Sequence, residues 1–93
     1  MLLKQIQYFL SVVDNNSFTE AAEECFISQS AISQQIKILE AELGVELLKR
    51  HNRGFSITPA GEYFYQQGKH IVDKIAKIKQ ETLRIGKAEN PHL

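Results

Sequence analysis

The sequence predicts a mainly α-helical domain with one short β-hairpin and a long C-terminal helix. Three observations support this prediction. Apolar residues recur at helical spacing over most of the chain, two short β-prone runs flank a turn containing Asn and Gly, and Thr58-Pro59 opens a last helical segment. At 93 residues, with 43% hydrophobic and 24% charged residues, the chain has the ordinary composition of one globular domain.

The first two helices are short and are separated by a polar break. Apolar residues recur at three- and four-residue spacing from Leu3 to Asp14, which indicates an amphipathic helix. After the break, Ser17 and Glu20 have the spacing of a capping box, in which each side chain bonds a free amide at the helix start. Cys25 continues the inner face of this second helix, so we expect it to be a buried small hydrophobe.

The third helix is predicted over residues 29–43, because Ser28 is a favoured N-cap and Gly44 is a favoured residue just past a helix end. One stripe is apolar and is expected to be buried: Ile32, Ile36, Leu39 and Leu43. The opposite face is polar and carries no acid over the first three turns: Ser30, Ser33, Gln34 and Lys37. Gln29 lies at the exposed first turn, and the pattern assigns no place to Ile38.

A small basic hairpin is predicted after the third helix. Residues 47–50 and 55–58 are short β-prone runs on either side of His51-Asn52-Arg53-Gly54. The chain carries 11 basic and 11 acidic residues in total, but residues 47–58 have a net charge of +3 and residues 14–26 a net charge of −4. Because salt limits the reach of exposed charges to about 8 Å, a local basic cluster can bind a polyanion even in a neutral chain.

The last helix is predicted to run from Pro59 to about Lys87. It carries an imperfect heptad seam, of the kind that pairs helices: Phe64, Gly68, Ile71, Ile75, Ile78 and Ile85. The apolar surface of this helix is wider than one partner needs. Part of it can therefore pack in the core of the same chain while another part forms a dimer seam. We expect a helical and hairpin domain over residues 1–58, a dimerisation helix over 59–88 and a tail over 89–93.

Several function classes are excluded by what the sequence lacks. One cysteine cannot form an internal disulfide, which fits a reducing cytoplasm. The histidines share no metal-ligand spacing with Cys25 or the acids, and there is neither a nucleophile-elbow pattern nor a glycine-rich phosphate loop. The longest apolar runs have three residues, too few for a membrane span. We therefore expect no enzyme activity, cofactor, metal or membrane partner.

The expected order of elements is that of a winged helix-turn-helix with an added dimerisation helix. An α-helix fits the DNA major groove, where the side chains near its N-terminus meet base edges. We therefore expect sequence-specific binding of double-stranded DNA, with the recognition helix 29–43 in the major groove and the basic wing 49–54 on the backbone or minor groove. The expected base contacts are Gln29, Ser33 and Gln34. The expected contacts to the backbone or minor groove are Ser28, Ser30, Lys37, Arg50 and Arg53.

Several blocks of the sequence resemble LysR-type transcriptional regulators. Ser17-Phe18-Thr19-Glu20-Ala21-Ala22 resembles the run before the turn, residues 27–37 resemble the recognition-helix run, and residues 39–50 and 57–61 continue in register. The resemblance implies the DNA-binding part of a bacterial regulator. It implies a homodimer joined through residues 59–88, in which each subunit reads one half of an interrupted inverted repeat. It also implies that a small-molecule effector acts only through a C-terminal effector domain, which is absent from this chain.

The sequence departs from the family pattern at four positions. Many relatives have proline at Ser30, arginine at Gln34 and phenylalanine at Leu48, and a polar residue is common at Phe26, which we expect to cover the core. Without arginine at position 34, the preferred bases cannot be taken from a typical relative. The alternative function is a winged-helix protein-interaction module that uses the same surface, although that surface lacks the exposed aromatic anchors of a protein hot spot.

Overall fold

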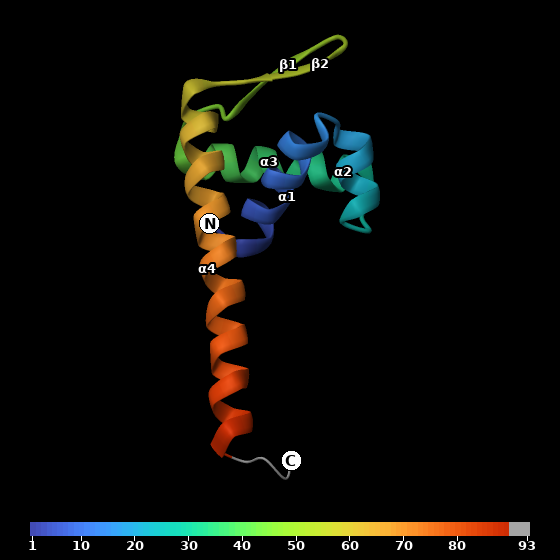
Figure 1. The fold of residues 1–93 in the computed structure, drawn as a ribbon. Helices are drawn as coiled ribbons and strands as arrows, with labels where there is room; N and C mark the ends of the chain where they lie inside the picture. Colours follow the sequence, from blue (N-terminus) through green and yellow to red (C-terminus); the bar gives the residue numbers. More distant parts are fainter. Residues whose placement is uncertain (90–93) are drawn as a thin grey trace.

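The computed structural model describes residues 1–89 and has the predicted order of four helices and one hairpin. The elements are α1 (Leu3–Asn15), α2 (Phe18–Glu24), α3 (Gln29–Leu43), β1 (Leu48–His51), β2 (Gly54–Ile57) and α4 (Pro59–Glu89). The first three helices and the hairpin form a head, from which α4 leaves as a rod (Figure 1). Helix α4 continues through Glu89, where a tail was expected to begin, and residues 90–93 lie outside the described residues.

Helices α2, α3 and α4 begin where the sequence predicts, because a hydroxyl side chain caps each of these starts. The Ser17 hydroxyl accepts from the Glu20 amide at 3.0 Å, and the Ser28 hydroxyl accepts from the Ala31 amide at 3.0 Å. The second half of the expected capping box is different. The Ser17 amide donates to the Val12 carbonyl at 3.3 Å, so the preceding helix already satisfies the group that Glu20 was expected to bond.

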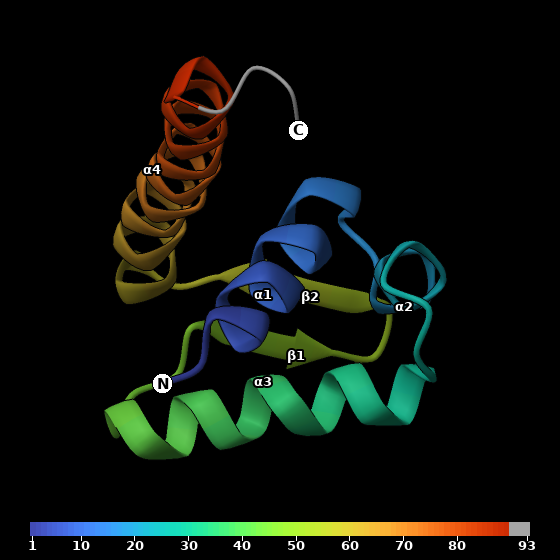
Figure 2. The same cartoon turned by 90° about the horizontal axis from the view of Figure 1, so that it is seen from below.

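The core lies between α1, α2 and α3, and α1 is the central element, in contact with α2, α3 and α4 (Figure 2). Its largest fully buried side chains come from three parts of the chain: Phe9, Val12, Ile32, Ile36, Leu39, Leu47 and Leu48. Two residues at the C-terminal half of α3 face solvent. Leu43 is 39% exposed, so its predicted burial is wrong. The reason is that the last turn of α3 extends beyond the body. Ile38 is 44% exposed.

The hairpin is a two-stranded antiparallel sheet that projects from the head as a wing (Figure 1). Leu48 pairs with Ile57 and His51 pairs with Gly54. Strand β1 therefore begins one residue later than predicted, and β2 begins one residue earlier. Only Leu48 of β1 is buried, while the rest of that strand faces solvent. The wing is therefore fixed to the body at its base and exposed at its tip.

Helix α4 packs on the head through two glycines, Gly61 and Gly68. The sequence pattern placed Gly68 in the predicted dimer seam. The Thr58 hydroxyl caps the helix by accepting from the Gly61 amide at 3.0 Å. A Cβ added at Gly61 would overlap the Leu47 carbonyl oxygen, and one added at Gly68 would lie 3.1 Å from Ile6 Cγ2. Both glycines let α4 pack closely against the head of the same chain. Gly68 is therefore a core contact and not a free member of a dimer seam.

The N-terminal part of α4 belongs to the same packed unit as the first three helices. Phe64 makes an edge-to-face contact with Phe9, with ring centroids 5.4 Å apart, and the half-buried Val72 also packs against the core. From residue 73 to 89 every residue is exposed. The predicted boundary at residue 58 thus divides a packed interface. The seam prediction included Phe64 because helical periodicity does not show which neighbour an apolar face contacts.

A polar contact fixes α4 against the end of α1. The Tyr65 hydroxyl donates to the Asp14 carboxylate, and the Lys69 ammonium lies 5.3 Å from the Tyr65 ring centroid. The hydrogen bond to Tyr65, followed by the charge of Asp14, raises the pKa of Lys69 above its ordinary value. Lys69 is exposed, so its contact contributes little to the stability of the fold.

Candidate nucleic-acid interface

The exposed face of α3 carries the polar residues that the sequence predicts. Five of the predicted contact residues on or beside this helix are exposed: Ser28, Gln29, Ser30, Gln34 and Lys37. Ser33 is half-buried, and Ile32, Ile36 and Leu39 on the other side are buried in the core. Helix α3 thus presents hydrogen-bonding groups to solvent while its apolar stripe fixes it to the head, as a groove-reading helix requires.

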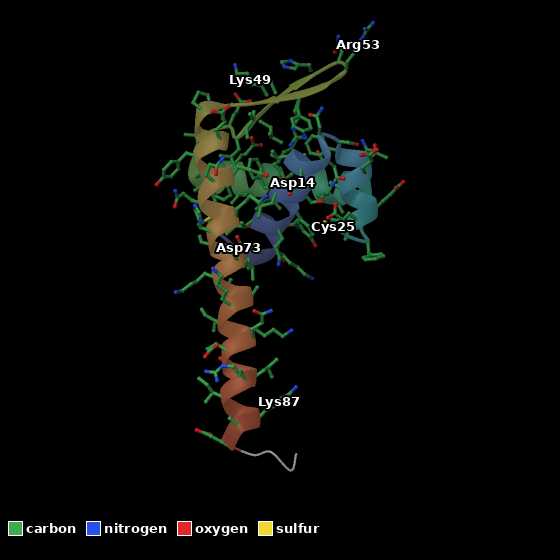
Figure 3. The ribbon with its side chains drawn as sticks, in the orientation of Figure 1. Asp14, Cys25, Lys49, Arg53, Asp73 and Lys87 are labelled. Atoms are coloured by element: carbon green, nitrogen blue, oxygen red, sulfur yellow. The ribbon has the colours of Figure 1, made fainter. Side chains whose placement is uncertain are left out.

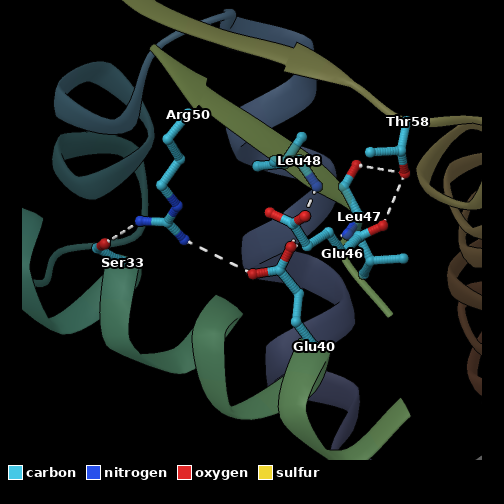
Figure 4. A network of polar contacts seen from close by, with 7 residues as sticks. All are labelled: Ser33, Glu40, Glu46, Leu47, Leu48, Arg50 and Thr58. Carbon is cyan, nitrogen blue, oxygen red and sulfur yellow. Dashed lines mark hydrogen bonds and ion pairs between the residues drawn. The ribbon is translucent and has the colours of Figure 1, made fainter. Parts of the chain in front are cut away.

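Arg50 is held against α3 instead of reaching freely into solvent. Its Nη1 donates to the Ser33 hydroxyl, and its Nη2 lies 3.9 Å from Glu40 Oε1 (Figure 4). Its guanidinium carbon lies 4.8 Å from the Phe18 ring centroid. The predicted sites Ser33 and Arg50 are therefore in direct contact. Arg50 connects the wing to the recognition helix, a role that differs from the predicted free cation for the DNA backbone.

Glu40 is a structural residue of this region that the sequence interpretation missed. Its Oε2 accepts from the Leu47 amide at 2.7 Å and from the Leu48 amide at 3.1 Å, and its side chain is only 13% exposed. The two amides satisfy the carboxylate and attach the start of the wing to α3 (Figure 4). From the sequence alone, Glu40 looks like a solvated acid of the helix. Its partners, the Leu47 and Leu48 amides, follow a turn whose path the sequence does not show.

Thr19 was also missed, and it contacts the first predicted base-reading residue. Its hydroxyl donates to Gln29 Oε1 at 3.0 Å. A hollow of about 230 Å³ lies where the start of α2, the start of α3 and the tip of the wing meet, and Thr19, Gln29 and Arg53 line it. The structure therefore places one predicted base-reading residue, Gln29, and one predicted backbone-binding residue, Arg53, around the same hollow.

The wing tip presents its cations outward. Lys49 and Arg53 are exposed, and both point away from the head (Figure 3). His51 Nε2 lies 3.0 Å from the Ser56 hydroxyl across the hairpin. Because no acid lies between residues 47 and 58, the wing is a local basic cluster of the kind that binds phosphates.

Phe26 lies in the turn before α3 and does not cover the core as expected. Its side chain is 93% exposed, and its backbone has φ 58°, in the left-handed region. The left-handed turn directs the side chain outward, away from the body. Asparagine or aspartate would adopt this conformation more easily than phenylalanine.

The distal part of α4 carries four exposed members of the predicted seam. Ile71, Ile75, Ile78 and Ile85 are all exposed.

Cys25 is half-buried, not fully buried, at the end of α2. Within residues 1–89 there is no cluster of three His, Cys, Asp or Glu side chains able to hold a metal ion. None of the helices described here has the length and apolar character to cross a membrane.

Comparison with known proteins assigns this arrangement to a family. The model of the bacterial regulatory helix-turn-helix protein, lysR family, matches residues 3–62. The chain belongs to the lysR family. This family consists of transcriptional regulators, in agreement with the expectation that the chain is not an enzyme.

The lysR-family relatives are much longer than this chain. The HTH-type transcriptional regulator BenM of Acinetobacter baylyi is 39% identical over 89 residues, which cover 96% of this chain and 29% of BenM. The regulator BudR of Raoultella terrigena is 39% identical over 93 residues, all of this chain and 32% of BudR. The chain thus spans about a third of the length of these relatives.

Solved structures similar to this chain include complexes with DNA. The crystal structure of the BenM_DBD/catB site 1 DNA complex has a TM-score of 0.89 and 40% identity, and covers 92% of this chain and 97% of that one. The CbnR_DBD–DNA complex has a TM-score of 0.87 and 31% identity, with 92% and 99% covered. These matches confirm the predicted winged helix-turn-helix with its long C-terminal helix.

Proposed function

We propose that this chain is the DNA-binding part of a lysR-family transcription regulator and binds double-stranded DNA sequence-specifically. The observation that carries the proposal is the joint placement of two surfaces. The polar face of α3, which carries no acid over its first three turns, and the basic wing are held together by Arg50 and Glu40. Base readout and phosphate binding therefore come from one preformed surface.

Each predicted contact residue has a distinct role in this proposal. Gln29, Ser33 and Gln34 lie on the exposed side of α3 and reach base edges in the major groove. Ser28, Ser30 and Lys37 flank them and contact phosphates, while Arg53 at the wing tip contacts the backbone or enters the minor groove. Arg50 acts mainly through its contact with Ser33.

The proposal includes a homodimer joined through α4. The exposed Ile71, Ile75, Ile78 and Ile85 form an apolar row beyond the head, and pairing would remove this row from water. A two-fold dimer requires a two-fold symmetric DNA site, so the expected partner is an interrupted inverted repeat. We also propose that the protein acts in the cytoplasm, and that any small-molecule effector acts through a part of the regulator outside this chain.

A protein-interaction module is the second candidate function, and one observation favours it. Phe26 is an exposed aromatic side chain in the turn that leads into α3, where the sequence predicted no such anchor. One aromatic residue outside the polar face is a weaker argument than the polar face and the basic wing together. The two functions differ in salt dependence, because only DNA binding releases counterions from phosphates.

Selection of bound duplexes from a random DNA pool, at about 50 and 200 mM salt, tests the proposed function. We expect an enriched, two-fold symmetric motif, and binding that falls by orders of magnitude at the higher salt. An enriched half-motif without symmetry would retain the DNA-binding function and contradict the dimer. Binding with no enrichment and no salt dependence would contradict DNA binding and favour the protein-interaction module.

A further inference from the structure

We infer that Gln29 and Ser33 meet the major groove as hydrogen-bond donors, fixed in that role by Thr19 and Arg50, and so select base pairs by the acceptors on their edges. This inference rests on the proposed function and specifies its chemistry. Thr19 and Arg50 are positioning residues in this account, since they act on the bases through Gln29 and Ser33.

The contact with Thr19 orients the amide of Gln29. A glutamine side chain has an acceptor oxygen and a donor NH₂ group on opposite sides of its amide. The Thr19 hydroxyl donates to Gln29 Oε1 at 3.0 Å, so the oxygen is directed at α2. The NH₂ group consequently remains for a ligand outside the protein. A bidentate contact with adenine needs both groups of the amide to face the same base, and this contact turns the oxygen toward α2 instead.

The contact with Arg50 has the same effect on Ser33. A hydroxyl has one hydrogen and two lone pairs, and Arg50 Nη1 donates to one of those lone pairs. The positive charge of the guanidinium also disfavours the approach of a second donor, such as the amino group of a base. The hydroxyl hydrogen of Ser33 is therefore the group available to DNA, and its partner has to be an acceptor.

Arg50 can maintain this orientation because its own position is fixed. Glu40 Oε1 lies 3.9 Å from Arg50 Nη2, and the ring of Phe18 lies beneath the guanidinium at 4.8 Å. Glu40 is in turn held by the amides of Leu47 and Leu48. The donor surface is thus built before DNA arrives, which lowers the cost of ordering these side chains on binding.

A donor-only surface makes a specific prediction about the DNA. In the major groove the acceptors are guanine N7 and O6, adenine N7 and thymine O4, while the amino groups of adenine and cytosine are donors. The base pairs that depend on Gln29 and Ser33 should therefore tolerate the loss of an amino group. They should not tolerate the loss of an acceptor.

Base analogues in the selected site distinguish these groups. A 7-deazapurine lacks the N7 acceptor, and 2-aminopurine lacks the adenine amino group in the major groove. We expect 7-deazapurine at a purine contacted by Gln29 or Ser33 to weaken binding about fivefold to tenfold. We expect 2-aminopurine to change binding less than about twofold. An equal loss with both analogues would indicate bidentate recognition of adenine and would overturn the inference.

Two variants test the positioning residues. Thr19→Val removes the hydroxyl that orients Gln29, so the penalty for 7-deazapurine should shrink, and Thr19→Ser should restore it. Arg50→Met should relax the preference at the base pair of Ser33. The matched control Lys49→Met removes a neighbouring wing cation and should weaken all duplexes alike. Unchanged analogue penalties in folded Thr19→Val and Arg50→Met would overturn the inference.

The two proposals fail in different ways. If the unmodified chain shows no salt-dependent binding to any duplex, the proposed function is contradicted, and the donor-surface inference is overturned with it. If it binds a selected duplex with strong salt dependence but loses equal affinity with the two analogues, only the donor-surface inference is overturned. Thermal unfolding of each variant establishes that it is folded.

Discussion

At the residue scale, Phe26 is the clearest conflict between local chemistry and structure. Its φ of 58° is uncommon for a residue with a bulky side chain, and its 93% exposure means that its ring gains almost nothing from burial. The turn between α2 and α3 fixes this backbone conformation. Phe26 therefore reduces the stability of the head without contributing to its core.

Phe26→Asn should stabilise the domain, because asparagine adopts the left-handed conformation more easily than phenylalanine. We expect the free energy of unfolding to rise by about 0.5 to 1 kcal/mol, measured by urea denaturation with an unchanged slope. Phe26→Ala is the matched control, since it removes the ring but keeps a Cβ, and it should change stability by less than about 0.5 kcal/mol. A less stable Phe26→Asn domain would show that the ring has a stabilising contact.

Arg53 is predicted to act on DNA through charge alone. Arg53→Ala should weaken all duplexes by a similar factor and reduce the slope of log affinity against log salt by about one unit, because one phosphate contact is lost. Lys87→Ala, at the distal end of α4 (Figure 3), is the matched control and should change neither quantity. A full salt slope in Arg53→Ala would contradict a phosphate contact at the wing tip.

Some residue roles followed from sequence and others did not. The caps at Ser17, Ser28 and Thr58 were predictable, because each hydroxyl bonds an amide only three residues away. Arg50 and Ser33 are 17 residues apart in the chain, and their contact depends on how the wing folds back over α3. The pattern of residue types predicts that Ser33 and Arg50 lie on exposed surfaces. It cannot show that these two side chains contact each other.

At the element scale, the start of α4 shows what periodicity alone leaves out. The heptad pattern predicted a long helix, and α4 runs from Pro59 to Glu89. It could not show that Phe64 and Gly68 face α1 while Ile75 and Ile78 face solvent, because both groups have the same spacing. The division arises because Phe64 and Gly68 lie where α4 packs on α1, whereas Ile75 and Ile78 lie beyond that contact.

Gly61→Ala tests this close contact. A Cβ there would overlap the Leu47 carbonyl oxygen and lie 2.8 Å from Ile57 Cγ1, so we expect a loss of about 2 kcal/mol in the free energy of unfolding. The matched control is Gly86→Ala in the same helix, where no atom lies within 4 Å of the added Cβ. Alanine is the better helix former, so that variant should be neutral or up to about 1 kcal/mol more stable. If chemical denaturation shows Gly61→Ala to be equally stable, α4 does not require this contact.

At the scale of the whole molecule, the rod-like α4 determines how two heads are placed relative to each other. The molecule measures 57 × 25 × 20 Å, and much of its length is the part of α4 beyond the head (Figure 1). The contact of Tyr65 with Asp14 holds this helix at a fixed angle to α1. In a dimer joined through α4, that angle sets the distance between the two recognition helices.

Ile75→Asp should separate the dimer, because it places a charge in the apolar row of α4, where Ile75 is 42% exposed. Light scattering should give the mass of one chain, and binding to paired half-sites should fall toward that of a single half-site. Gln80→Asp adds the same charge about 140° around the helix from Ile75 and should leave the dimer intact. A dimeric Ile75→Asp variant would place the interface elsewhere.

The central claim is that α3 reads bases while the wing supplies binding that is independent of sequence. It is tested most directly by the affinity of the unmodified chain and of Gln29→Ala for the selected duplex and a scrambled one. We expect Gln29→Ala to lose about 1–3 kcal/mol of binding free energy on the selected duplex and almost nothing on the scrambled one. An equal loss on both duplexes would contradict base readout by Gln29 and would leave α3 as a backbone contact.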